Sequence, residues 1–279
     1  MHVLTLPAPC KLNLFLHVTG RRADGYHLLQ TVFQLLDYGD ELAFESRLDG
    51  GIRLQTDLQG VDPEDNLVVR AAHALKARSG SSRGVDIKLL KRTPVGAGLG
   101  GGSSDAATTL LGLNRLWDCG LSVDELAAMG LALGADVPVF VRGCSAWAEG
   151  IGEHLTPIAL PSRWYLVIYP GYPVNTAGIF KDPQLTRSTP EITMAAFLGG
   201  HSHNDCEPVA SRIYPEIARA LAWLAGYGAA RMSGTGSAVF AAFEDEQAAQ
   251  EAAASVPMEW TRFVALGLNR SPVHSALGL

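Results

Sequence analysis

Apolar and polar residues alternate along the first part of the chain. The residues Leu12, Leu14, Leu16 and Val18 alternate with Lys11, Asn13, Phe15 and His17. A period of two predicts a strand with one buried face, which places Lys11 and Asn13 together on the opposite face. Shorter runs of the same kind predict strands over residues 30–36, 41–45, 52–56 and 85–90.

Helical patterns occupy the segments between these strands. Asp65-Asn66 is a suitable N-cap for a helix that runs to about residue 78, with Leu67, Ala71 and Leu75 on one face. A second helix is expected to start within 103–105, where Ser-Ser-Asp offers favoured helix-start residues. A third is expected over 122–133.

The second half of the chain has a regular order of elements. The expected elements are a strand over 164–169, a helix over 208–227, strands over 229–232 and 237–243, a helix over 245–256 and a strand over 262–266. This β-α-β-β-α-β order is typical of a ferredoxin-like domain. Two prolines within residues 156–162 suggest the junction, which gives domains of 1–158 and 159–279.

The amino-acid composition and charge of the chain limit which classes of function are expected. The chain has 279 residues, is 47% hydrophobic and 18% charged, and carries a net charge of −6. These values predict a well-packed globular protein and do not suggest nucleic-acid binding. The sequence shows neither a membrane span nor a signal peptide. Four widely spaced cysteines are expected to be reduced thiols in a cytoplasmic protein.

A glycine-rich stretch over residues 93–107, T-P-V-G-A-G-L-G-G-G-S-S-D-A-A, carries the clearest chemistry. Its glycines are Gly96, Gly98, Gly100, Gly101 and Gly102. Glycine lets the backbone turn through positive φ and approach a ligand closely. Because the loop leads into a helix N-terminus, it predicts an anion site whose commonest guest is a phosphate.

Other phosphate loops fit less well. The spacing of Gly96, Gly98 and Gly101 matches the dinucleotide fingerprint, but the next expected element is a helix rather than a parallel strand. The loop has no lysine, as a Walker A loop requires, and the chain has neither His-Arg-Asp nor Asp-Phe-Gly. A flexible linker would not need the helix start that follows.

Several polar residues have both a structural and a functional interpretation. Lys11 and Asn13 form either a solvated strand face or a polar floor under a substrate, and Asp136 either caps a turn before Pro138 or has a charged partner or catalytic task. Tyr26-His27 is either packing or recognition. Lys91-Arg92 is either a pair of strand-end charges or part of a nucleotide site. His201-x-His203 is either a polar loop or part of a metal site.

The motifs taken together resemble the GHMP small-molecule kinases over almost the whole chain. They are residues 8–14, 25–27, 65–67, 94–107, 134–138, 180–183, 204–207 and 234–236. The resemblance implies an α+β protein of two domains, an N-terminal α/β domain and a C-terminal ferredoxin-like domain, with ATP bound between them. Mg²⁺ is expected with the ATP, but its ligands are not identifiable from the sequence.

The resemblance also implies roles for individual residues. The catalytic residues would be Lys11 and Asp136. The ATP contacts would be Asn66, Lys91, Pro94, Gly96, Gly98, Gly100, Gly101, Gly102, Ser103 and Ser104. The substrate contacts would be Asn13, Tyr26, His27, Thr176, Phe180, Gly234 and Thr235. Tyr26 and Phe180 would sandwich a planar base, whose polar edge His27 would read.

Within the family, these motifs most resemble the members that phosphorylate the 2-hydroxyl of a CDP-linked methylerythritol in the non-mevalonate isoprenoid pathway. The alternative is a family member that acts on homoserine, mevalonate or a sugar. Those substrates have no base for Tyr26, His27 and Phe180 to contact. The expected partner is thus a small molecule, bound by a monomer or homodimer in the cytoplasm without a role for nucleic acid or membrane.

Overall fold

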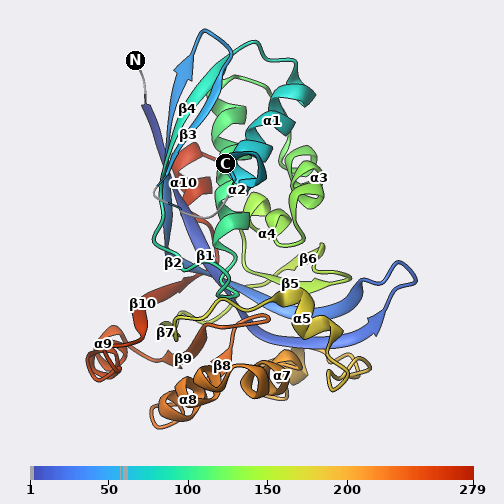
Figure 1. Cartoon of the computed structure of the whole chain (residues 1–279), viewed down its shortest axis with the longest axis vertical. Coiled ribbons are helices and arrows are strands. Elements are labelled where there is room, and N and C mark those ends of the chain that lie inside the picture. Colours follow the sequence, from blue (N-terminus) through green and yellow to red (C-terminus); the bar gives the residue numbers. More distant parts are fainter. Residues whose placement is uncertain (1–2, 57, 59–61) are drawn as a thin grey trace.

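The computed structural model describes residues 3–56, 58 and 62–279 (Figure 1). Its first domain is built on a long antiparallel hairpin of β1 (Val3–Arg21) and β2 (His27–Arg47). The two short strands expected over 30–36 and 41–45 are therefore parts of one continuous strand. β4 (Gly84–Leu90) pairs antiparallel with β2, and β3 (Ile52–Thr56) lies parallel to β4 at the edge.

Helices lie on one side of this sheet (Figure 1). They include α1 (Leu67–Ser79), α2 (Gly101–Leu116), α3 (Val123–Leu133) and α4 (Val137–Arg142), and a 3₁₀ turn, η1 (Pro63–Asp65), precedes α1. The helices α1 and α2 pack against the strands, and α3 and α4 pack on these two helices. The Asn66 side chain accepts a hydrogen bond from the Val68 N–H, and Ser122 forms a capping box with Glu125. Both predicted helix starts are therefore confirmed. The helices start at these residues because each cap satisfies a backbone N–H that the helix leaves unpaired.

Two helices begin where the sequence did not indicate. α2 starts at Gly101 after the left-handed Gly100, so Ser103 and Ser104 lie inside its first turn and do not cap it. The positive φ of Gly100 turns the chain into the helix, which makes a side-chain cap unnecessary. The short helix α4 was not expected. Asp136 occupies its N-cap position but forms no capping hydrogen bond, which leaves its carboxylate available.

The second domain has the predicted ferredoxin-like topology. Its four strands lie in the order β10 (Thr261–Leu268), β7 (Trp164–Tyr169), β9 (Val239–Phe243) and β8 (Arg231–Met232). The helices of this half of the chain are α5 (Thr176–Lys181), α6 (Met194–Leu198), α7 (Cys206–Ile213), α8 (Pro215–Leu224) and α9 (Glu246–Ala254). The single helix expected over 208–227 is wrong: Pro215 cannot donate a backbone hydrogen bond, so it starts a new helix, α8.

The two domains are joined by more than one crossing of the chain. β10 pairs with β2 at Gly267–Leu36 and Leu268–Leu35, and α10 (Pro272–Leu277) returns to the first domain, where Val273 joins its core. The hairpin of β1 and β2 makes a second connection, because it extends from the first domain toward α7 of the second domain (Figure 1). There Val18 packs in the second core.

A pair of short strands, β5 (Ala146–Glu149) and β6 (His154–Pro157), adds to the first sheet through β2. The boundary near residue 158 stays a prediction. Within the part of the chain described here, no helix combines the length and apolar character needed to cross a membrane.

Candidate active site

Two cavities meet at the glycine loop. The larger one, of about 780 Å³, lies between the hairpin, α5 and the loop over residues 233–236. The smaller one, of about 330 Å³, lies between the N-terminal ends of α1 and α2. Gly96, Gly98 and Ser103 line both cavities. A ligand in one cavity would therefore adjoin a ligand in the other across the glycine loop.

The glycine loop is held in a fixed shape by its backbone and by the second domain. Gly96, Gly98 and Gly100 have φ values of 68°, 76° and 71°, a region that side chains rarely allow. The Ser233 hydroxyl donates to the carbonyl of Gly98 at 2.9 Å. A Cβ on Gly98 would lie 2.2 Å from the Ser233 carbonyl oxygen, so no other residue fits without backbone movement.

Lys11 and Asp136 face each other in the larger cavity. The Lys11 Nζ lies 3.3 Å from the Asp136 Oδ2 and donates to the Gly98 carbonyl at 2.9 Å and to the Asn13 Oδ1 at 2.5 Å. The Lys11 side chain is only 3% exposed, whereas that of Asp136 is 34% exposed. Lys11 is thus locked in place by three acceptors, while the Asp136 carboxylate remains open to the cavity.

This pair lies beside the N-terminus of α2, where unpaired N–H groups favour negative charge. Asp136 can accept a proton from a bound hydroxyl group, and Lys11 can stabilise negative charge that develops next to it. The structure therefore supports the functional interpretation of Lys11 and Asn13 over a solvated strand face. It equally favours a charged partner for Asp136 over a simple turn cap.

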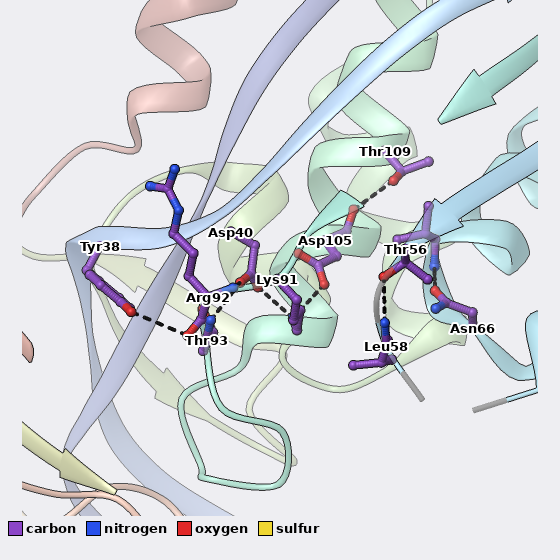
Figure 2. Close-up of polar contacts among 11 residues, drawn as sticks. Tyr38, Asp40, Thr56, Leu58, Asn66, Lys91, Arg92, Thr93, Asp105 and Thr109 are labelled. Atoms are coloured by element: carbon purple, nitrogen blue, oxygen red, sulfur yellow. Dashed lines mark hydrogen bonds and ion pairs between the residues drawn. The ribbon is translucent and has the colours of Figure 1, made fainter. Parts of the chain in front are cut away.

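A buried ion cluster lies behind the smaller cavity (Figure 2). Lys91 Nζ donates to the Asp40 Oδ2 at 2.5 Å and to the Asp105 Oδ2 at 2.7 Å. Burial alone would lower the pKa of Lys91, but the two carboxylates more than offset this and raise it. Lys91 is therefore a cation held at the cavity wall, and only its uncommitted third N–H bond is available to a ligand.

The two carboxylates of this cluster differ in their partners. Asp40 also accepts hydrogen bonds from the Arg92 and Thr93 backbone N–H groups at 2.6 and 2.7 Å. Among the described residues, Asp105 is hydrogen-bonded only by Lys91, and its buried Oδ1 has no hydrogen-bond partner. Burial, assisted by the charge of Asp40, raises the pKa of Asp105 to about 7. The cluster thus contains one carboxylate with three hydrogen-bond donors and another, Asp105, whose pKa lies near neutral pH.

Aromatic side chains gather at the far end of the larger cavity. His27 and Phe180 are stacked, with ring centroids 4.9 Å apart and an interplanar angle of 21°. Tyr26 is 61% exposed. Phe180 therefore rests on His27 here, rather than facing Tyr26 across the gap that the sequence interpretation expected for a base. Thr176 and Thr235 share a hydrogen bond of 2.9 Å at the same cavity.

The structure gathers the predicted residues into the two expected groups, with one exception. Lys11, Asn13, Tyr26, His27, Asp136, Thr176, Phe180, Gly234 and Thr235 line the larger cavity. Asn66, Lys91, Pro94, Gly96, Gly98, Gly100, Gly101, Gly102 and Ser103 line the smaller one. The exception is Ser104, which does not line either cavity and whose hydroxyl is buried without a hydrogen-bond partner.

Sequence reasoning did not identify three charged residues at these cavities. Among them, Arg187 lines the larger cavity and Asp105 the smaller one, although Asp105 belongs to the glycine-loop motif, whereas Asp40 lies behind the smaller cavity as a partner of Lys91. Asp40 and Arg187 stand in no motif, so only the folded structure reveals their positions. The possible metal site at His201-x-His203 receives no support. Across the residues described, no three His, Cys, Asp or Glu side chains come close enough to hold a metal ion.

Comparison with known proteins agrees with this geometry. Residues 66–144 match the GHMP kinases N terminal domain, and residues 190–260 match the GHMP kinases C terminal domain. A 4-diphosphocytidyl-2-C-methyl-D-erythritol kinase of Pseudomonas paraeruginosa is 57% identical over 98% of this chain and 97% of its own length. A Pseudomonas aeruginosa protein of the same name is 56% identical over the same shares.

Solved structures show the same fold. A crystal structure of 4-(cytidine 5'-diphospho)-2C-methyl-D-erythritol kinase superposes with a TM-score of 0.84 at 35% identity, over 95% of this chain and 99% of that one. A mevalonate kinase superposes with a TM-score of 0.71 at only 14% identity, over 97% and 100% of the two chains, so it shows the fold alone. The chain therefore belongs to the GHMP kinase family and, within it, to the 4-diphosphocytidyl-2-C-methyl-D-erythritol kinases.

Proposed function

We propose that this protein transfers the γ-phosphoryl group of ATP to the 2-hydroxyl of 4-diphosphocytidyl-2-C-methyl-D-erythritol in the non-mevalonate isoprenoid pathway. The products are the 2-phosphate and ADP. One observation carries the proposal: Lys11 and Asp136 stand 3.3 Å apart where the larger cavity adjoins the glycine loop. An acceptor hydroxyl and a terminal phosphate would meet there.

The smaller cavity suits the nucleotide. Gly100, Gly101 and Gly102 line it at the start of α2, so the first backbone N–H groups of the helix can donate to phosphate oxygens. Lys91 and Asn66 line the same cavity, and the sequence assigns them to the nucleoside. Because phosphoryl transfer requires mainly positioning and charge stabilisation, a preformed phosphate cradle supplies much of what the reaction needs.

The larger cavity suits the acceptor. The substrate's 2-hydroxyl would donate to the Asp136 carboxylate, and its oxygen would attack the γ-phosphorus in line. The hydroxyl proton passes to Asp136 as the new O–P bond forms, while the bond from the γ-phosphorus to the β–γ bridging oxygen breaks and ADP leaves. Lys11 holds its ammonium beside the transferring group, where it stabilises the charge of the transition state.

Mg²⁺ would accompany the nucleotide and neutralise its phosphate charge. The Asp105 side chain lines the nucleotide cavity, and its Oδ1 has no hydrogen-bond partner among the described residues, which suits a hard cation that prefers oxygen. No three carboxylates, histidines or cysteines converge within the described part of the chain. The proposed ion is accordingly bound mainly by phosphates and water, with few protein ligands.

The alternative is another GHMP kinase activity, on mevalonate, homoserine or a sugar. The base end of the larger cavity argues against it, because Tyr26, His27 and Phe180 would have no planar group to contact. The volume of about 780 Å³ also exceeds what such small acceptors fill. These features and the 57% identical relative support a nucleotide-linked substrate.

The test is phosphorus NMR of the reaction with ATP and the CDP-linked substrate. We expect a new monoester resonance from the 2-phosphate, formed in step with ADP. Mevalonate, homoserine and galactose serve as competing acceptors in separate reactions. Turnover of any of these at a comparable kcat/KM would overturn the proposal in favour of the alternative.

A further inference from the structure

Arg187 stands behind the aromatic end of the larger cavity and holds it together. Its Nε donates to the His27 Nε2 at 3.3 Å. Its other nitrogens donate to the backbone carbonyls of Phe180, Asp182 and Leu185 at 2.9, 2.6 and 3.0 Å. One guanidinium therefore connects His27 to the chain segment that carries Phe180, the residue stacked on His27.

This contact fixes where the proton of His27 lies. A guanidinium has no acceptor and does not lose its proton in proteins, so Arg187 must be the donor. The His27 Nε2 must then be an unprotonated acceptor, which leaves the ring proton on Nδ1. Among the described residues, no group accepts a hydrogen bond from that Nδ1. Burial, followed by the charges of Arg187 and Arg21, lowers the pKa of His27, which agrees with a neutral ring.

We propose that Arg187 is a positioning residue that holds His27 as the Nδ1–H tautomer, so that His27 offers the base a hydrogen-bond donor and selects cytosine over uracil. The inference rests on the proposed function, because it assumes that a pyrimidine occupies this end of the cavity. Arg187 acts through His27 and through the Phe180 segment, and it takes no part in the phosphoryl transfer at Asp136.

The chemistry of the two bases gives the selectivity. Cytosine has two adjacent acceptors, O2 and N3, whereas uracil has a donor, N3–H, in place of the second. An Nδ1–H donor directed at ring position 3 is accepted by the N3 of cytosine but opposes the N3–H of uracil. A mismatch of this kind leaves polar groups unsatisfied and corresponds to roughly 10- to 100-fold in kcat/KM.

The first test is the tautomer itself, measured by nitrogen NMR of the free protein with the His27 signals assigned through His27→Gln. We expect a protonated Nδ1 and an unprotonated Nε2 in the wild-type protein at neutral pH. In Arg187→Met, which keeps the length of the side chain but removes its donors, both tautomers should appear. A wild-type ring protonated on Nε2 would overturn the proposal, whatever the substrate proves to be.

The second test is kinetic and compares CDP-linked with UDP-linked methylerythritol. We expect the wild-type preference for cytosine to fall about tenfold in Arg187→Met, mainly through KM, with kcat and the KM for ATP nearly unchanged. Arg212→Met is the matched control. Arg212 also binds this segment, through the Asp182 carboxylate at 2.5 Å, but does not contact His27, so its removal should leave the preference intact.

The outcomes separate this inference from the proposed function. If the wild-type protein phosphorylates both substrates equally well, the function stands and the role of Arg187 is wrong. An unchanged preference in Arg187→Met, or an equal loss in Arg212→Met, would also overturn it. If the protein phosphorylates neither substrate, the proposed function fails, and the tautomer measurement still decides whether Arg187 sets the proton of His27.

Discussion

The two cavities are built in different ways. The nucleotide cavity is formed by backbone, namely positive-φ glycines and a helix N-terminus, and is supported by the buried charged side chains of Asp40, Lys91 and Asp105. The base end of the substrate cavity is made of side chains at the surface. Its Tyr26 is 61% exposed, and Phe180 rests on His27.

This difference suggests a division of labour. A backbone cradle is fixed by the fold and binds any nucleoside triphosphate through its phosphates. Side chains on a hairpin and a short helix can rearrange around a specific base, and their binding energy is realised far from the reacting hydroxyl. We therefore expect changes in the first cavity to affect folding or ATP, and changes in the second to affect substrate choice.

The largest effect is expected where the two cavities meet. Asp136→Asn should lower kcat by about 10²- to 10⁴-fold, because the amide cannot accept the hydroxyl proton. Stability should fall only modestly, since Asp136 makes no capping hydrogen bond and its partner Lys11 keeps the acceptors of Asn13 and Gly98. Steady-state kinetics and thermal unfolding measure the two quantities. The control is Asp124→Asn, which removes only an exposed carboxylate of α3 that pairs with Arg142 at the end of α4. A kcat for Asp136→Asn equal to that of this control would contradict the assignment.

In the nucleotide cavity, Asp40→Asn should cost stability before it affects catalysis. Its carboxylate is fully buried and accepts hydrogen bonds from Lys91 and two backbone N–H groups. Breaking such a set should lower the free energy of unfolding by about 3–5 kcal/mol, as measured by urea denaturation. Asp37→Asn on the same strand, which loses one exposed contact to the Leu266 N–H, should cost about 1 kcal/mol or less. Equal losses would show that the cluster is not a structural support.

Adjacent glycines at the start of α2 offer a finer test of the cradle. A Cβ on Gly101 would lie 2.9 Å from the Thr93 Cγ2 and 3.0 Å from Lys91 Nζ, whereas one on Gly102 meets only Leu67 at 3.6 Å. Overpacking at Gly101 should cost about 1–3 kcal/mol of free energy and distort the cavity. We therefore expect Gly101→Ala to weaken ATP binding about tenfold or more. Gly102→Ala should change it little. Calorimetric titration with an ATP analogue would refute the cradle if both variants bound it equally.

The last expected effect is a pH dependence from Asp105. Burial raises its pKa to about 7 from an ordinary 3.8, so the folded protein keeps a proton that the unfolded chain releases. The stability due to this proton is complete below about pH 4 and is lost as pH rises through about 7. Relative to Asp105→Asn, the wild-type free energy of unfolding should therefore fall between about pH 4 and 7, by at most about 1.4 kcal/mol per pH unit, and level off above pH 7. Parallel stability curves would contradict this.

Much of the fold follows from local patterns. The strand after Lys11, the Asn66 and Ser122 caps and the ferredoxin-like order of the second half all appear in the structure, because each depends on neighbouring residues. The single buried face expected for that strand is wrong, because Lys11, Asn13 and His17 on the other face are buried as well. The length and continuity of the strands did not follow from local patterns. β2 is one strand of 21 residues, since pairing with β1, β4, β5 and β10 along its length outweighs local composition.

The candidate site was predictable where a motif marks it. The glycine loop predicts an anion site through its own residues, and the family resemblance implies the roles of Lys11 and Asp136; the structure brings these residues together, and their roles stay predictions. Gly101 shows what the motif alone cannot reveal. This position excludes a side chain because Thr93 and Lys91 pack against it, and not because its φ is positive. Arg187 lies 160 residues from His27 in the sequence, so their contact exists only in the folded chain.

The most direct test of the account compares the CDP-linked substrate with methylerythritol phosphate, which carries the acceptor hydroxyl but no base. If the base end of the cavity positions the hydroxyl at Asp136, kcat/KM should fall by about 10²-fold or more for the truncated compound, because stacking and the edge hydrogen bond are lost. Tyr26→Ala should then impair only the full substrate. Equal kcat/KM values for the two compounds in the wild-type protein would contradict the division of labour between the cavities and the substrate proposed here.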